Sequence, residues 1–250
     1  MSTLGLTLVH TKYSLLETLR VPIAVIGTLV FPTLAFCLFV LPQAAVTSNP
    51  EYATAAVASM IVFAYMSAGL FSIGLDLAEQ RSKPWAPYLR TLPGSPTARI
   101  GGILLATLVA ATGAMVPLLI VGGLFTSARP PLPHLLAAIG LVILTAIPSA
   151  LIGFVIGTTA GPKAAIAITQ VAMFLLAFGG GLFLPPMLFP DWLDMASRTL
   201  PIRQAREIVV GAALGADIPL WAVVGVIAWT VALGVLAVVL YRRDEGRRYR

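Results

Sequence analysis

The sequence EQRSKPWAPYLRTLPG, residues 79–94, is a compact polar segment between two long apolar runs. It places the acid Glu79 close to the bases Arg81, Lys83 and Arg90, and it contains three prolines. The runs on either side carry no charged residue for twenty or more positions. A membrane-spanning helix needs roughly 20 predominantly apolar residues. The segment therefore predicts a polar connection between two transmembrane helices.

The composition extends this interpretation to the whole chain. Of its 250 residues, 58% are hydrophobic and 10% are charged, whereas a soluble domain has about 25% charged residues. The apolar runs suit helices better than the short alternating strands of a barrel. We therefore expect an all-α membrane protein with one transmembrane domain over residues 1–250. Its six predicted spans lie near residues 21–41, 52–76, 98–126, 135–160, 164–184 and 218–241.

The distribution of Lys and Arg predicts the orientation in the membrane. With six spans both ends of the chain lie on one side, and that side receives twelve of the 16 basic residues. The other side receives Arg129, Arg198, Arg203 and Arg206, while the acidic residues divide equally. Because basic loops stay cytoplasmic, we expect both termini and segment 79–94 in the cytoplasm. The net charge of +6 then reports topology, and we expect no nucleic-acid partner because no basic stripe has interleaved aromatics.

Two amphipathic regions accompany the spans. Residues 3–19 gather Thr, Ser, His10 and Glu17 on one arc of a helical wheel, which predicts a helix lying in the membrane interface. Residues 183–217 are too long for a connecting turn and mix apolar with charged residues. We expect a re-entrant pair of short outer helices there, whose charged side chains form pairs or face water. The residues assigned to this outer hairpin are Pro185, Pro186, Trp192 and Pro201.

Small residues and prolines predict how the spans pack and bend. Four small residues recur at every fourth position of the fourth span and form a stripe that another helix can approach closely. That helix can belong to the same subunit or to a second copy. The stripe consists of Ser149, Gly153, Gly157 and Gly161. Prolines inside the first, third and fourth spans predict kinks, at Pro32, Pro117 and Pro148.

The chain carries little recognisable catalytic chemistry. The apolar runs contain no ionisable residue, and such residues normally mark ion or proton paths in membranes. There is no carboxylate pair, His cluster or nucleophile triad at membrane depth, and the single Cys37 predicts no disulfide framework. There is also no GxxxxGK[ST] phosphate-binding loop. We expect no catalytic residue and no metal site, so uphill movement would draw its energy from another polypeptide.

The order of these features resembles the permease subunits of type-2 ABC exporters over essentially the whole chain. EQRSKPWAPYLRTLPGSPTARIGG, residues 79–102, looks like the family's charged cluster and short helix after the second span. GGGLFLPPMLFPDWL and RTLPIRQAREIVVGA look like its re-entrant region before the last span. The family often has Gly-Thr after the charged cluster, where this chain has Lys83-Pro84.

The resemblance implies a role for segment 79–94 as a coupling helix that docks in a groove of an ATPase subunit. It assigns this contact to Glu79, Arg81, Lys83, Trp85, Tyr88, Leu89 and Arg90. It also implies two ATPase subunits that bind ATP and magnesium, a second permease copy or homologue, and a place in the cytoplasmic membrane. This chain would itself hold no cofactor. The uncharged spans favour an amphipathic or lipophilic substrate, such as a drug-like compound or a lipid.

Two other classes of protein remain open from the sequence. A membrane-embedded enzyme would need polar side chains converging at a membrane face, for which the outer loop is the candidate region. A non-transporting assembly subunit would tolerate the loss of segment 79–94. Activity of the purified chain alone would favour the first of these, and an intact role without the segment would favour the second.

Overall fold

The computed structural model describes residues 3–20, 30–84 and 96–246. Within those ranges every element of secondary structure is a helix or a helical turn, and no strand is present, in agreement with the predicted all-α class. The elements are α1 (Thr3–Arg20), α3 (Phe31–Phe39), α4 (Ala44–Thr47), α5 (Pro50–Ala68), the π-helical turn η2 (Gly69–Ile73), α6 (Gly74–Ser82), α8 (Pro96–Phe125), α9 (Leu132–Thr145), α10 (Ile147–Thr159), α11 (Pro162–Gly179), the 3₁₀ turn η3 (Pro186–Leu188), α12 (Asp191–Ser197), α13 (Pro201–Leu214) and α14 (Leu220–Gly246).

Five helical stretches in the described part of the chain are long and apolar enough to cross a membrane. They correspond to the second to sixth predicted spans: Pro50–Ser82, Gly101–Phe125, Leu132–Thr159, Pro162–Gly179 and Leu220–Leu240. Of the first predicted span, 21–41, residues 21–29 lie outside the described residues, and α3 occupies its second half. The count of six spans therefore stays a prediction.

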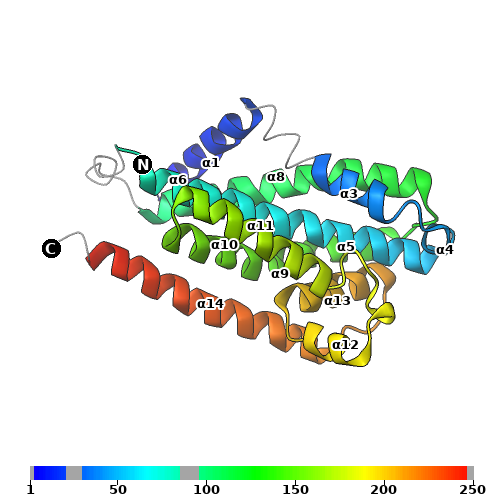
Figure 1. Cartoon of the computed structure of the whole chain (residues 1–250). Helices are drawn as coiled ribbons and strands as arrows, with labels where there is room; N and C mark the ends of the chain where they lie inside the picture. Colours follow the sequence, from blue (N-terminus) through cyan, green and yellow to red (C-terminus); the bar gives the residue numbers. More distant parts are fainter. Residues whose placement is uncertain (1–2, 21–29, 85–95, 247–250) are drawn as a thin grey trace.

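The long helices run side by side, with α5, η2 and α6 forming one continuous rod through the middle of the bundle (Figure 1). In this rod 78% of an apolar stretch of 18 residues is buried inside the bundle, whereas the buried share of the corresponding stretch of α14 is 17%. The rod is thus the core of the bundle, and α14 presents most of its apolar surface outward. Exposed Val and Ile side chains line α14, as expected where lipid replaces water as the solvent: Val224, Ile227, Val231 and Val235.

Prolines and glycines set the helix boundaries at several predicted positions. The fourth span breaks at Ala146, and Pro148 stands in the first turn of α10, where its missing N–H costs little. Pro117 lies inside the continuous helix α8. The fifth span ends at Gly179 and is followed by Gly181 with φ of 74°, a conformation that favours glycine. The α-helix therefore does not continue into the Gly- and Pro-rich half of that run, which contains the 3₁₀ turn η3.

The N-terminal helix α1 packs its polar arc against the beginning of α8. A Cβ on Gly102 would lie 2.5 Å from the Cβ of His10, so the two backbones touch there. The hydroxyl of Thr11 donates to the carbonyl of Gly102 at 3.3 Å. On the other side of α1, Leu4 and Leu8 are exposed. The polar arc therefore serves helix packing, and the leucines present the apolar surface expected of an interfacial helix.

The stripe of small residues on α10 is the site where the backbones of two helices meet. A Cβ on Gly153 would lie 2.4 Å from the carbonyl oxygen of Gly69, and one on Gly157 would lie 2.7 Å from that of Gly74. Gly69 is the first residue of the π-helical turn, and Gly74 directly follows it. The turn η2 therefore crosses α10 where both helices have glycine in place of larger side chains. Ser149 is 1% exposed and extends the contact, whereas a Cβ on Gly161 would meet no described atom within 4 Å. This packing partner lies in the same subunit.

Gly153→Ala should lower stability because the new methyl group cannot coexist with the Gly69 carbonyl in the present packing. We expect the free energy of unfolding to fall by about 1–3 kcal/mol, the usual cost of overpacking. The measurement is thermal unfolding of the purified protein in one detergent. Gly140→Ala is the matched control, since a Cβ at this mid-helix position meets nothing within 4 Å. Equal melting temperatures for the two variants would contradict the packing argument.

Candidate functional site

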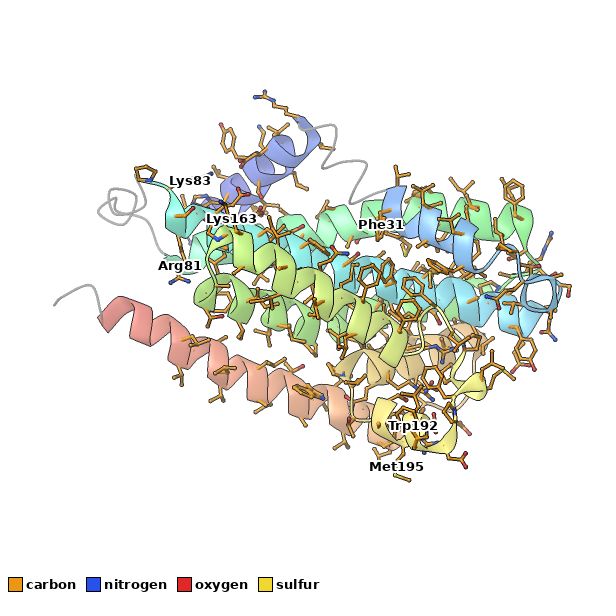
Figure 2. All side chains as sticks on the ribbon, in the orientation of Figure 1. Phe31, Arg81, Lys83, Lys163, Trp192 and Met195 are labelled. Carbon is orange, nitrogen blue, oxygen red and sulfur yellow. The ribbon has the colours of Figure 1, made fainter. Side chains whose placement is uncertain are left out.

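The two regions that the sequence analysis assigned to function lie at opposite ends of the bundle. Arg81, Lys83 and Lys163 lie at one end, and Trp192 and Met195 lie at the other (Figure 2). The first end carries the start of the segment predicted to be cytoplasmic, and the second carries the region predicted to form the outer hairpin. Both ends are candidate sites.

At the first end, the rod continues farther than predicted. Glu79 and Arg81 belong to the helix α6, which ends at Ser82. Lys83 is extended, with ψ of 136°, because the residue before a proline avoids the helical region. The other residues assigned to coupling, Trp85, Tyr88, Leu89 and Arg90, lie outside the described residues.

Arg81 has a structural contact that the sequence did not reveal. Its Nη1 donates to the carbonyl oxygens of Gly157, at 3.1 Å, and Thr158. Both carbonyls belong to the last turn of α10, where backbone acceptors lack helical partners and the helix dipole is negative. Arg81 therefore ties the end of α6 to the end of α10. A coupling role for Arg81 would act through α10 as well as through direct contact with a partner.

At the second end, the outer region forms the two short helices α12 and α13, preceded by η3. Pro201 is buried in the first turn of α13, and Pro186 begins η3, where it packs on Gly181. Pro185 precedes η3, and Trp192 is 71% exposed. The helix α13 is almost entirely buried and packs against α5, α9 and α14. The depth of this region relative to the lipid stays a prediction.

Five charged residues of α12 and α13, and of the turn between them, form a continuous chain of ion pairs. Arg198 binds Asp194 at 2.7 Å, Asp194 binds Arg203 at 3.1 Å, Arg203 binds Glu207 at 2.9 Å, and Glu207 binds Arg206 at 2.9 Å. The Arg203 Nε–Glu207 contact has ion-pair distance without hydrogen-bond geometry. The sequence interpretation left open whether these side chains would pair or face water, and here they pair.

The two ends of this ion-pair chain have different surroundings. The Arg198 side chain is 55% exposed and lies 5.7 Å from the centre of the Trp221 ring. Arg203 and Arg206 are 6% and 8% exposed. Burial lowers the pKa of the Arg206 guanidinium, and the carboxylate of Glu207 opposes that change. Buried arginines in a short outer helix could not be identified from the sequence, because their burial depends on helices distant in the chain.

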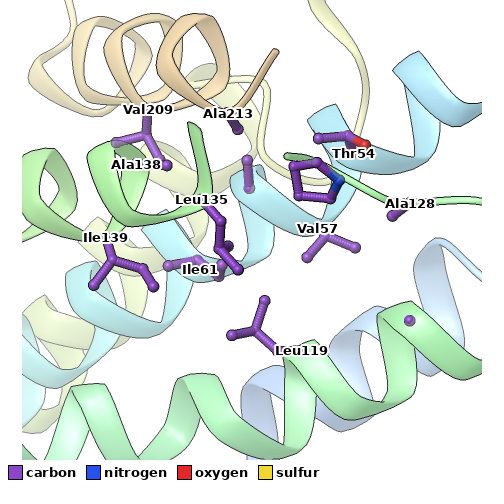
Figure 3. Close-up of a pocket in the computed structure, with 13 residues that line it drawn as sticks. Thr54, Val57, Ile61, Leu119, Ala128, Leu135, Ala138, Ile139, Val209 and Ala213 are labelled. Atoms are coloured by element: carbon purple, nitrogen blue, oxygen red, sulfur yellow. The ribbon is translucent and has the colours of Figure 1, made fainter. Parts of the chain in front are cut away.

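Two cavities lie near α13. The smaller one, of about 200 Å³, lies between α5, α8, α9 and α13 and is lined by apolar side chains such as Ile61, Leu119 and Val209 (Figure 3). The larger one, of about 490 Å³, lies between the start of α5, the segment before it and residues 181–188. Arg206 and Glu207 reach its wall from α13. Within the described residues, no three His, Cys, Asp or Glu side chains are grouped to hold a metal.

A helical bundle with this composition and with five helices able to span a bilayer defines a multi-pass membrane protein. No protein-family model matches the chain. It is similar to the Bacillus subtilis protein named "Putative transport permease YvfS", with 24% identity over 144 residues. The similar region covers 57% of this chain and 58% of that protein. The chain is thus a multi-pass helical membrane protein that shares part of its sequence with a protein named as a transport permease.

Arg203→Met should destabilise the protein because it leaves Asp194 and Glu207 without their shared partner. Breaking a buried ion pair costs about 3–5 kcal/mol when it leaves a charge unpaired. Because Arg198 still binds Asp194 and Arg206 still binds Glu207, we expect a smaller loss in thermal unfolding, yet one larger than for Arg198→Met. Arg198→Met is the control. Its side chain is largely exposed, and an exposed pair contributes about 1 kcal/mol or less. A similar cost for both variants would show that burial does not strengthen the Arg203 contacts.

Proposed function

We propose that the chain is the membrane-spanning subunit of an ATP-driven type-2 ABC exporter. The observation that carries the proposal is the order of its elements. An amphipathic helix precedes the spans, a charged segment follows the second predicted span, and two short helices precede the last one. The similarity to a protein named as a transport permease supports the same class.

In this proposal the ATP-hydrolysing site lies in a separate subunit, present twice, which binds ATP and magnesium. Segment 79–94 docks on that subunit in the cytoplasm, and both termini lie on the same side of the plasma membrane. Arg81 then has a mechanical purpose, because its bonds to the end of α10 transfer a displacement of the segment to two helices at once. A second permease, identical or homologous, completes the path.

The proposed cargo is an amphipathic or lipophilic molecule. The apolar runs of the spans, such as 52–75 and 100–128, contain no charged residue, so a strongly hydrophilic solute would lose its hydration without compensation there. The apolar cavity of Figure 3 illustrates such an interior, with Val57, Ile61 and Leu119 in its wall. Transport restricted to a strongly hydrophilic solute would contradict this part of the proposal.

The deciding experiment is copurification from the native host in mild detergent. The tagged chain should retain an ABC ATPase, and the double variant Trp85→Ala/Leu89→Ala should lose at least about nine-tenths of it, as expected for apolar anchors of an interface. The matched control is Trp192→Ala/Met195→Ala, two exposed apolar residues at the opposite end of the bundle, which should retain the ATPase.

If the parent chain retained no ATPase under these conditions, the result would favour the two alternatives, a membrane-embedded enzyme or a non-transporting assembly subunit. Loss of the ATPase from both double variants would instead point to a general loss of folding. ATP-dependent transport in vesicles that contain the copurified complex would then test the direction of movement, with export as the expected result.

A further inference from the structure

The wall of the larger cavity is apolar on one side and also contains charged side chains. Buried Leu182 and Phe183 form its apolar side, and the Phe183 ring packs between those of Phe39 and Phe63 at centroid distances of 4.8 and 4.9 Å. Exposed residues of α4, α5 and η3 surround its opening, among them Tyr52 and Met187. Its volume of about 490 Å³ falls within the range of about 300–1,000 Å³ for small-molecule sites.

The cation in this wall is Arg206, which is 8% exposed. A guanidinium has five N–H donors, and the hydrogen bond of Arg206 to another side chain is the one from Nη1 to Glu207. Its Nε is buried and has no hydrogen-bond partner among the described residues. Because Nε is closed to solvent, a ligand in the cavity would meet the part of the guanidinium that is exposed in the wall.

The ion-pair chain that ends at Arg206 carries one net positive charge of its own. It alternates from Arg198 to Arg206 and contains three guanidiniums and two carboxylates. Glu207 divides one oxygen between Arg203 and Arg206. The other carboxylate in the cavity wall is Glu51, which is exposed, and no ion pair of the described residues joins it to Arg206.

We propose that this cavity binds a single-chain amphipathic anion, whose acidic group meets Arg206 and whose apolar body packs against Phe183 and Leu182. A carboxylate or a phosphate monoester supplies the acceptor oxygens that a guanidinium binds best. Gln43 and Ser59 offer further polar atoms in the wall. The inference deepens the proposed function, on which it rests for the statement that the ligand is cargo; binding itself requires no ATPase.

The test uses the purified full chain in nanodiscs of phosphatidylcholine. The probe is a fatty acid that carries a photoactivatable diazirine, and its methyl ester is the neutral counterpart. Mass spectrometry then locates the labelled residues. We expect the acid to label residues of the cavity wall with saturation, and the ester to label them at least about tenfold more weakly, as for a lost charged hydrogen bond.

Substitutions test whether labelling depends on the charge of Arg206 or only on an intact fold. Arg206→Gln should weaken labelling by the acid at least about tenfold, and Arg206→Lys should restore part of it. The matched control is Arg198→Gln, which removes the same charge from the exposed end of the same ion-pair chain and should label as the parent does. Ala45→Phe introduces a ring at an exposed position of the wall and should block labelling without altering any charge.

Three outcomes would overturn the inference. The first is equal labelling by the acid and the ester, and the second is acid labelling elsewhere than in the cavity. The third is abolition of labelling when phosphatidylglycerol is added to the nanodiscs, which would make the occupant a headgroup of the bilayer. Because these nanodiscs contain no ATPase, the result is independent of the copurification experiment, and failure of the cavity site is distinguishable from failure of the exporter assignment.

Discussion

The contact between the glycine-flanked turn η2 and α10 is the interaction on which the rest of the bundle depends. In lipid, helices gain nothing by hiding apolar surface from water, and association depends on close packing of small residues and on polar contacts. Gly69 and Gly74 on one side, and Gly153 and Gly157 on the other, let the backbones touch. This contact joins the buried rod to α10, and α10 in turn packs against α11 and α14.

The two ends of the bundle use charge in opposite ways. At the end that carries Arg81, a guanidinium binds the unsatisfied carbonyls of α10 and so completes a helix terminus. At the end that carries α13, the guanidiniums bind carboxylates in a chain that runs from the exposed Arg198 to the buried Arg206 beside a cavity. A bilayer protein with few charges thus concentrates them where spans end and where helices must be fixed against each other.

Much of this architecture follows from the sequence because lipid enforces simple rules. Long uncharged runs predicted the five membrane-length helical stretches, and the amphipathic region 183–217 predicted the two short helices α12 and α13. The break near Pro148 and the end of α-helix at Gly179 follow from a missing donor and a positive φ. The π-helical turn could not be predicted, since a shift in hydrogen bonding within a helix depends on what packs against it. Burial of Arg203 and Arg206 was likewise hidden, because α5, α9 and α14 provide it. The coupling residues from Trp85 to Arg90 remain predictions that rest on resemblance.

The continuous rod Pro50–Ser82 also connects the two ends of the bundle mechanically. Its 33 residues, at about 1.5 Å rise each, extend roughly 50 Å, from Tyr52 at the wall of the larger cavity to Arg81 at the opposite end. A rigid helix of that length transmits a displacement of one end to the other end unless the helix bends in between. The wider turn η2 is the one interruption of its α-helical hydrogen bonding. Because π-bulges are common sites of helix bending, a displacement of α5 along its axis would reach α6 through this turn.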